Sequence, residues 1–239
     1  MKVEIWSDIF CPFCYIGKRK FELALKEFDK KEEVEVRYRS FELNPNAPKS
    51  YDKNIHEIIA SKYGISYEEA KLNNDNIVRQ AKELGLEYNF DTLVATNSFD
   101  AHRMIHFADK YGKIEEMTEA LFKAYFTDSK NVSDFNTLAE IANSIGLDKE
   151  EAIRVLNSND FKDSVRKDEE MAISYGISSV PFFIFNDKFS VSGAQPKEMF
   201  LIALNKAMED EKGFIDLNKK NIDDNKENEN LCVDGKCNI

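Results

Sequence analysis

Glycine and proline are scarce in this chain, whose 239 residues include nine of the first and five of the second. Together with 42% hydrophobic residues, this composition argues against a fibrous or disordered chain and predicts a packed globular core. Long apolar runs are missing as well, since no stretch approaches the roughly 18 residues that a membrane span needs. The N-terminal sequence MKVEIWSDIF has no apolar run behind a basic start, so no secretory signal is predicted and we expect a cytoplasmic protein without membrane contact.

Positive charge is in deficit. Lys and Arg number 33 against 44 Asp and Glu, which gives a formal net charge of −11. Because phosphate binding needs a clustered positive surface, this balance argues against a nucleic-acid partner. Many of the 18 Phe residues are expected in the hydrophobic core. Some could instead form an exposed patch at a dimer interface, so the sequence leaves the oligomeric state open.

The four cysteines form two close pairs, and the first pair lies where a strand passes into a helix. Residues 3–6 read as a short strand, and helical periodicity begins near Pro12, directly after Cys11. A helix N-terminus stabilises a thiolate, so Cys11 is the expected nucleophile and Cys14, one turn deeper, the resolving thiol. The alternatives are a structural disulfide or half a zinc site. The strand-to-helix position favours redox chemistry.

The order of predicted elements indicates an α/β fold. A strand over 34–41 follows the first helix, residues 51–175 show helical periodicity, and a hairpin over 181–191 precedes a last helix with Pro196 near its first turn. This order predicts a thioredoxin-type fold, a central mixed β-sheet with a large all-helical insertion. The expected parts are an N-terminal half (1–50), the insertion (51–175), a C-terminal half (176–218) and a flexible tail with the second cysteine pair (219–239).

Val180-Pro181 opens the first strand of the predicted hairpin. In thioredoxin-type folds a cis proline stands opposite the cysteine pair, and the backbone before it pairs with a substrate chain. An ordinary trans proline at a strand start is the alternative, because cis forms make up only about 5–6% of X–Pro bonds. Combined with the cysteine motif, the position predicts a cis bond and assigns substrate binding to Val180 and Pro181.

Three further polar residues are candidates for a role beside the cysteine pair. Asp8 reads as a turn or cap residue, or as a proton relay to Cys14 if it is buried beside it. His102 and His106 share one face of a predicted helix, as zinc ligands often do, but no acidic residue completes such a motif. We interpret both as packed or surface histidines and predict no metal site.

Several motifs together resemble the FrnE-like branch of the DsbA oxidoreductase family. They are Ser7-Asp8-x-x-Cys11-Pro12-x-Cys14-Tyr15-x-Gly17, Phe41-Glu-Leu-Asn-Pro45, Asn97-Ser-Phe-Asp-Ala-His-Arg103 and Val180-Pro-Phe-Phe183. The resemblance implies a thioredoxin fold with a helical insertion, an attacking cysteine at Cys11, a resolving one at Cys14 and a cis proline at Pro181. Relatives carry Trp or His where this chain has Phe13, so we expect a less oxidising disulfide here.

Cys232 and Cys237 form the second pair, and the resemblance extends to it. We expect the tail pair to relay electrons to Cys11 and Cys14; a passive disulfide and soft-metal capture are the alternatives.

The function predicted is thiol–disulfide exchange with protein or small-molecule substrates, with no cofactor beyond glutathione as a reductant or co-substrate. The alternatives are a glutathione-dependent isomerase or kappa-type transferase, and a chaperone-like or metal-buffering protein.

Overall fold

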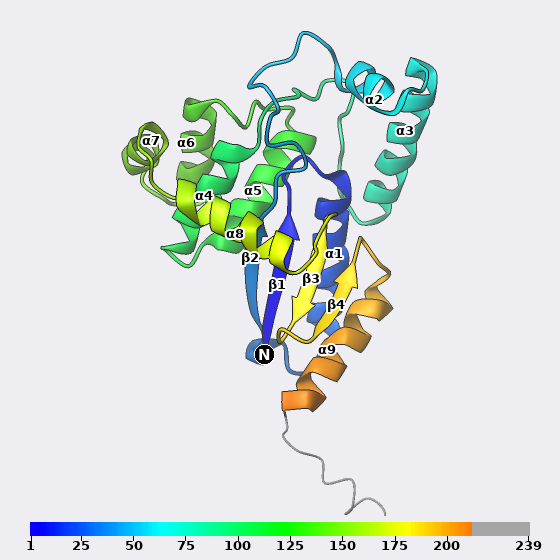
Figure 1. Ribbon diagram of the computed structural model, residues 1–239, viewed down its shortest axis with the longest axis vertical. Helices are drawn as coiled ribbons and strands as arrows, with labels where there is room; N and C mark the ends of the chain where they lie inside the picture. The colour runs from blue at the N-terminus through cyan, green and yellow to red at the C-terminus, as the bar shows by residue number, and fades with distance from the viewer. Residues whose placement is uncertain (212–239) are drawn as a thin grey trace, which may run out of the picture.

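The computed structural model describes residues 1–211, so the predicted tail with Cys232 and Cys237 lies outside the described residues. Its centre is one four-stranded sheet in the order β2-β1-β3-β4 (Figure 1). β1 and β2 run parallel, whereas β3 is antiparallel to both β1 and β4. The strands are β1 (Lys2–Ser7), β2 (Glu35–Ser40), β3 (Phe182–Phe185) and β4 (Phe189–Ser192). The predicted mixed sheet is confirmed.

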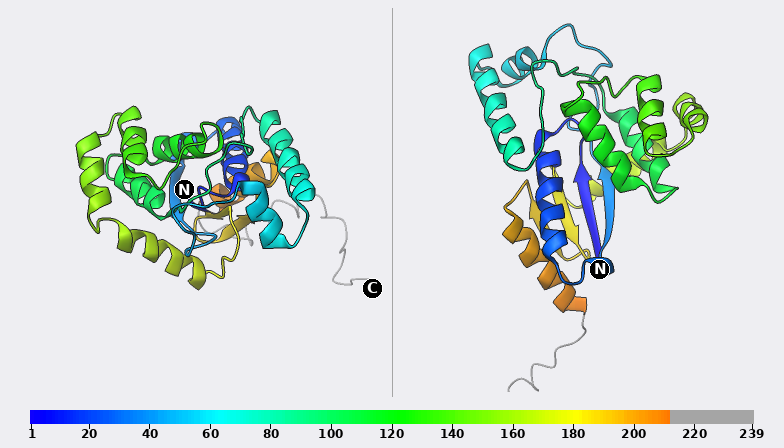
Figure 2. Two further views of the ribbon diagram at one scale, coloured as in Figure 1. Left: turned by 90° about the horizontal axis from the view of Figure 1, so that it is seen from above. Right: turned by 180° about the vertical axis from the view of Figure 1, so that it is seen from behind.

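One face of the sheet is covered by α1 (Pro12–Glu27) and α9 (Lys197–Glu211), as the view from behind in Figure 2 shows. Side chains alternate along a strand, so Phe183 points to this face while its neighbours on β3 point away. The Phe183 ring lies 5.6 Å from that of Phe21 on α1 and 4.7 Å from that of Phe200 on α9. Large rings bury much area per residue, and this aromatic cluster fixes both helices on the sheet.

The opposite face carries α8 (Lys162–Ser174). Trp6 on β1 points to this face and packs with Ala172, Ile177 and Ile184, all buried. Its indole nitrogen donates a hydrogen bond of 3.1 Å to the carbonyl of Asp168 on α8. Trp6 therefore belongs to the core, and its polar end ties the sheet to the last helix before β3.

The remaining helices lie between β2 and α8 in the sequence and surround the carboxyl end of β1 (Figures 1 and 2). Asp134 and Asp148 cap two of these helices and accept hydrogen bonds from the backbone N–H of Thr137 and Glu151 at 2.8 and 2.6 Å. A short 3-10 helix, η1 (Lys31–Glu33), precedes β2. The helices are α2 (Ile55–Tyr63), α3 (Tyr67–Glu83), α4 (Phe99–Asp109), α5 (Ile114–Phe126), α6 (Phe135–Ser144) and α7 (Lys149–Asn157).

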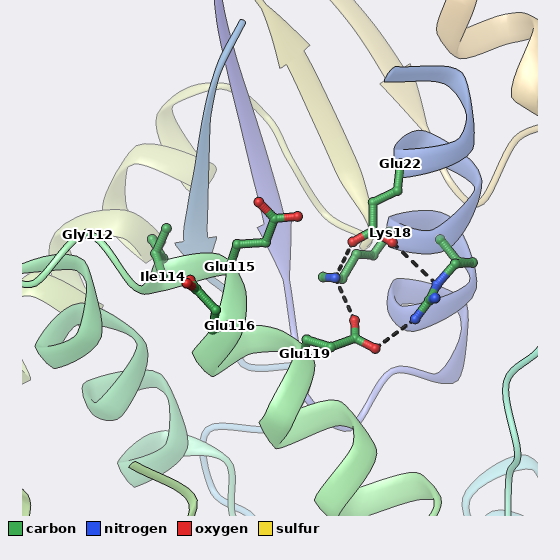
Figure 3. Close-up of a pocket in the computed structure, with 8 residues that line it drawn as sticks. Lys18, Glu22, Gly112, Ile114, Glu115, Glu116 and Glu119 are labelled. Carbon is green, nitrogen blue, oxygen red and sulfur yellow. Dashed lines mark hydrogen bonds and ion pairs between the residues drawn. The ribbon is translucent and has the colours of Figure 1, made fainter. Parts of the chain in front are cut away.

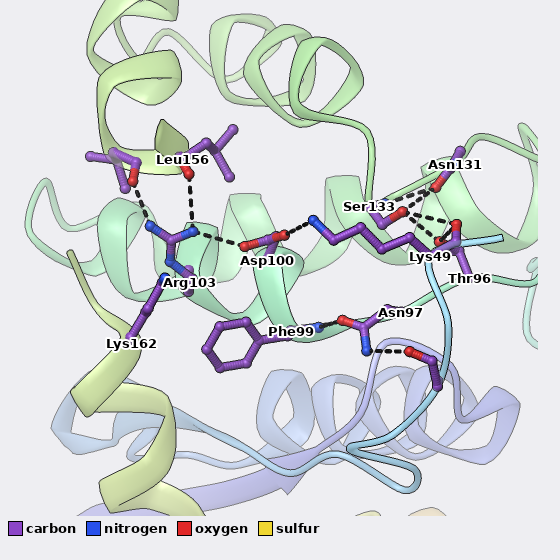
Figure 4. A network of polar contacts seen from close by, with 12 residues as sticks. Lys49, Thr96, Asn97, Phe99, Asp100, Arg103, Asn131, Ser133, Leu156 and Lys162 are labelled. Atoms are coloured by element: carbon purple, nitrogen blue, oxygen red, sulfur yellow. Dashed lines mark hydrogen bonds and ion pairs between the residues drawn. The ribbon is translucent and has the colours of Figure 1, made fainter. Parts of the chain in front are cut away.

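Arg103, the last residue of the Ala-His-Arg segment, holds α4 to the connection between α7 and α8 (Figure 4). Its side chain is 1% exposed and pairs with Asp100 at 2.8 Å. The other guanidinium hydrogens go to the carbonyls of Val155, Leu156, Ser158 and Asp160. A planar fork of donors suits the end of a helix, where carbonyls lack partners within the helix.

Among residues 1–211, no helix has both the length and the apolar character needed to cross a membrane.

Candidate active site

Cys11 and Cys14 lie at the start of α1, at the carboxyl end of β1. Cys11 has extended backbone angles and occupies the N-cap position, Pro12 follows as the first helical residue, and Cys14 lies in the first turn. Proline is suited to that position because its missing N–H has no partner within the helix. Both cysteines are free thiols and both are buried, Cys11 at 5% and Cys14 at 1% exposure. The pair therefore has the position that the sequence predicts.

Val180 and Pro181 face this pair. The Cys11 thiol lies 3.6 Å from the carbonyl oxygen of Val180, and the Val180–Pro181 peptide bond is cis, as predicted. On the other side, Pro181 lies directly against Gly17 of α1, where an added Cβ would come within 2.8 Å of the proline Cγ. The loop before β3 and the first two turns of α1 thus enclose the Cys11 thiol from both sides.

Cys14 is the inner sulfur. Burial raises the pKa of the Cys14 thiol well above its usual range, and the neighbouring Cys11 adds to that rise. The backbone of Asp8 and the hydroxyl of Ser7 act in the opposite direction and lower the pKa. These two residues at the end of β1 therefore stabilise the Cys14 thiolate.

An aromatic cluster supports the first turn of α1. The Tyr15 ring stacks on Phe122 of α5 at 4.9 Å and 6° between planes, and the Tyr88 hydroxyl donates to the Pro12 carbonyl at 2.8 Å. Burial, the hydrogen-bonded carboxylate of Glu119 and its charge raise the pKa of Tyr15 well above its usual range. Sequence reasoning missed Tyr88, because nothing in the stretch around it indicates contact with the cysteine motif.

Glu119 also lines a hollow of about 800 Å³ between α1 and α5 (Figure 3). It pairs with Lys18 and Arg19 of α1 at 2.6 and 2.7 Å, and it accepts a hydrogen bond of 2.6 Å from Tyr15. No cysteine lines this cavity. The ion pairs join α1 to α5 behind the first turn of α1, and the cavity is separate from the cysteine pair.

Of the other polar candidates, Asp8 and His102 lie together, whereas His106 lies apart from them. Asp8 is fully buried, and His102 lies 3.5 Å from its carboxylate. His106, one turn further along α4, instead contacts Asp168 and Ser40, both at 3.1 Å. Although the two histidines lie one turn apart on the same helix, each contacts a different aspartate.

Residues 2–205 match the DSBA-like thioredoxin domain family. The chain belongs to this family. It is similar to the protein YwbO of Bacillus subtilis, with 31% identity over 211 residues, which are 87% of this chain and 96% of YwbO. A structure from Streptomyces coelicolor described as a probable DsbA oxidoreductase is 41% identical, with a TM-score of 0.84 over 88% of this chain and 91% of that one.

The same fold also serves another class of enzyme. A 2-hydroxychromene-2-carboxylate isomerase is similar in structure, with a TM-score of 0.62 and 16% identity over 93% of this chain and 98% of the isomerase. At that identity the likeness concerns the fold alone. Placement in the FrnE-like branch stays a prediction, and so do the roles expected for Cys232 and Cys237, which lie outside residues 1–211.

Proposed function

We propose that this DsbA-like protein exchanges disulfides with protein or small-molecule thiols through Cys11 and Cys14. One observation carries the proposal: two buried thiols lie at the first turn of a helix, with the outer one 3.6 Å from the carbonyl of Val180. Val180 and Pro181 are the backbone against which a substrate chain would dock beside Cys11. Phe13, 40% exposed between the two cysteines, adds an apolar contact for that chain.

The reaction that these groups support has two displacements. The Cys11 thiolate attacks one sulfur of a substrate disulfide, which forms a mixed disulfide and releases one substrate thiolate. Cys14 loses its proton and attacks the Cys11 sulfur, closing the Cys11–Cys14 disulfide and releasing the second thiolate. The two protons given up by the cysteines pass to the two released thiolates, and two electrons pass from protein to substrate. Run backwards with glutathione or another small thiol as reductant, the same steps restore the dithiol.

The test is a redox titration in glutathione buffers, with free thiols trapped by alkylation and each cysteine assigned by peptide mass. We expect Cys11 and Cys14 to be oxidised together. Cys11→Ser should abolish exchange, whereas Cys14→Ser should accumulate the mixed disulfide, since its resolving thiol is gone. A pair that stays reduced across the accessible range would contradict the proposal.

A glutathione-dependent isomerase is the second reading, and the shared fold of the chromene-carboxylate isomerase is what favours it. That reading needs one nucleophile, whereas this chain buries a second thiol behind the first. Rapid turnover of a small electrophile with glutathione that survives Cys14→Ser would support the isomerase.

The finer proposal concerns the tail. We infer from the sequence that Cys232 and Cys237 exchange with the Cys11–Cys14 disulfide and relay electrons to it. Replacing both tail cysteines with serine should lower turnover while Cys11 and Cys14 still cycle in the titration. Unchanged turnover in the double variant would contradict the relay and leave Cys11 and Cys14 as the redox pair. The cytosolic location expected from the sequence stays a prediction.

A further inference from the structure

Three ionisable side chains are buried together beneath the loop that leads to Cys11: Asp8 at the end of β1, Glu42 just after β2 and His102 on α4. The side chains of Asp8 and Glu42 are fully buried and that of His102 is 1% exposed. Burying a charge costs free energy unless the charge is paired, so the contacts within this cluster determine whether it is tolerated.

His102 lies at the centre of this cluster. Neither of its ring nitrogens has a directed hydrogen-bond partner among the described residues, and Nε2 faces the carboxylate of Asp8 at 3.5 Å as an ion pair. Burial acts to lower the pKa of His102, but the carboxylate of Asp8, with further contributions from Glu42 and Glu169, outweighs it and raises the pKa above the usual value. The acidic neighbours of His102 therefore favour its protonated form over the neutral one.

Asp8 connects this cation to both cysteines. Its carboxylate accepts hydrogen bonds from the backbone of Phe10 at 3.2 Å and Leu43 at 2.7 Å, which fixes the loop 8–11 against the segment after β2. Its carbonyl accepts the Cys11 N–H at 3.0 Å, and its backbone lowers the pKa of Cys14. Any movement of Asp8 would therefore change the surroundings of both the Cys11 and the Cys14 sulfur.

We propose that His102 is a positioning residue for the closing of the Cys11–Cys14 disulfide, acting through its buried ion pair with Asp8. The inference rests on the proposed disulfide exchange. Among the described residues, His102 contacts the Asp8 carboxylate and neither sulfur. The carboxylate in turn fixes the backbone that lowers the pKa of Cys14. The step that depends on it is the second displacement, in which Cys14 gives up its proton and attacks the Cys11 sulfur.

The charged surroundings come from several elements. Asp8 faces His102 from the end of β1, Glu42 from the segment after β2 and Glu169 from α8. Arg166 of α8 donates to Glu42 at 2.7 Å and to Glu169 at 2.6 Å. On α5, the charge of Asp8 contributes to a raised pKa of Tyr125, after burial. Removing the imidazole of His102 leaves the buried Asp8 carboxylate without this partner.

The test follows the two displacements separately in the full-length protein. Reduced protein is mixed with oxidised glutathione, quenched with acid at intervals and analysed by mass, so that the glutathione adduct on Cys11 and the closed disulfide are counted. The first step depends on glutathione concentration and the second does not. His102→Gln is compared with His106→Gln, a matched control that removes a histidine–aspartate pair on the same helix, one turn away.

We expect His102→Gln to slow the concentration-independent step about tenfold, the effect of losing one charge-assisted contact. Its pH profile should move to higher pH, because the Cys14 thiolate loses backbone support. The adduct-forming step should keep its rate, and His106→Gln should match the unmodified protein in both steps. Equal effects of the two variants, or a closing rate unchanged in His102→Gln, would overturn the positioning role.

Should His102→Gln not fold, Asp8→Asn tests the same ion pair. This variant keeps the size of the side chain but removes its charge. Its single amide oxygen can accept from the backbone N–H of Phe10 or of Leu43, but not from both. The same slowing of the closing step is expected, and a normal closing rate would refute the inference. If the unmodified protein forms neither the Cys11 adduct nor the closed disulfide, disulfide exchange itself fails. If it forms both and the variants close normally, only the role of His102 fails.

Discussion

Gly17 lies in the second turn of α1, where its Cα faces Pro181 and Ala194. A Cβ at this position would lie 2.8 Å from the Pro181 Cγ and 3.5 Å from Ala194. Glycine is normally unfavourable inside a helix, by about 1 kcal/mol relative to alanine. Its presence here is explained by the close approach of the proline that lies beside Cys11.

We predict that Gly17→Ala destabilises the protein by about 1–3 kcal/mol, against its helix propensity, because the methyl group overpacks the contact with Pro181. The exchange rate should fall as well, since the loop beside Cys11 must move. Urea unfolding and turnover of a small disulfide measure the two effects. A gain in stability with normal turnover would show that the loop around Pro181 moves aside without affecting Cys11.

Glu42 gives a second prediction for a single residue, this time in pH. Burial raises the pKa of Glu42 from 4.5 to about 7, although the charge of His102 and the hydrogen bond from Arg166 oppose the rise. Between these pH values the folded protein holds a proton that the unfolded chain has released. The free energy of unfolding therefore falls as the pH rises from about 4.5 to 7, and the loss is complete above that window.

Glu42→Gln should remove this pH dependence, because glutamine can still accept from Arg166 but does not titrate. Its stability relative to the unmodified protein should improve by on the order of 1–3 kcal/mol between pH 4.5 and 7.5. Urea unfolding of both proteins at the two pH values measures the difference. A gap that does not change with pH would mean that Glu42 stays ionised in the folded state.

At the scale of elements, Arg103 decides how α4 is attached. Its guanidinium serves Asp100 and four carbonyls around the end of α7, a set that an ammonium group cannot satisfy. We predict that Arg103→Lys lowers the free energy of unfolding by at least about 3 kcal/mol, since buried carbonyls lose their donors. The exposed Arg154 on α7 is the control: Arg154→Lys should stay within about 0.5 kcal/mol. Equal stability of the two variants in urea would contradict this role of Arg103.

The same scale shows what sequence could predict. The strands predicted at 3–6 and 34–41 and in the hairpin over 181–191 match β1 to β4, because strand signals act between near neighbours. The cysteine pair at a helix start was readable for the same reason. The contact of His102 with Asp8 and that of Tyr88 with Pro12 join residues far apart in the chain. They depend on how α4 lies against the loop after β1 and how the segment after α3 lies against the start of α1, which no local pattern encodes.

At the scale of the whole molecule, the sheet and the helices inserted between β2 and β3 share one core. The sheet contributes Trp6, whose indole bonds to Asp168, and Arg39, which pairs with the same aspartate at 3.0 Å. On the other side of the sheet the aromatic rings of α1 and α5 stack directly, Tyr15 on Phe122. The inserted helices therefore complete the core of the sheet and do not form a separate one.

We predict from this shared core that sheet and helices unfold in a single transition. The chain has one tryptophan, Trp6, which is fully buried between β1 and α8 and reports on their contact. Far-ultraviolet circular dichroism reports mainly on the helices. Urea curves from tryptophan fluorescence and from circular dichroism should coincide in midpoint and slope, because separating α8 from β1 exposes Asp168 and Arg39 along with the indole. If the fluorescence change came at lower urea than the loss of helix, the inserted helices would hold a stable core without the sheet, and the contacts around Trp6 would be a docking interface between two folding units.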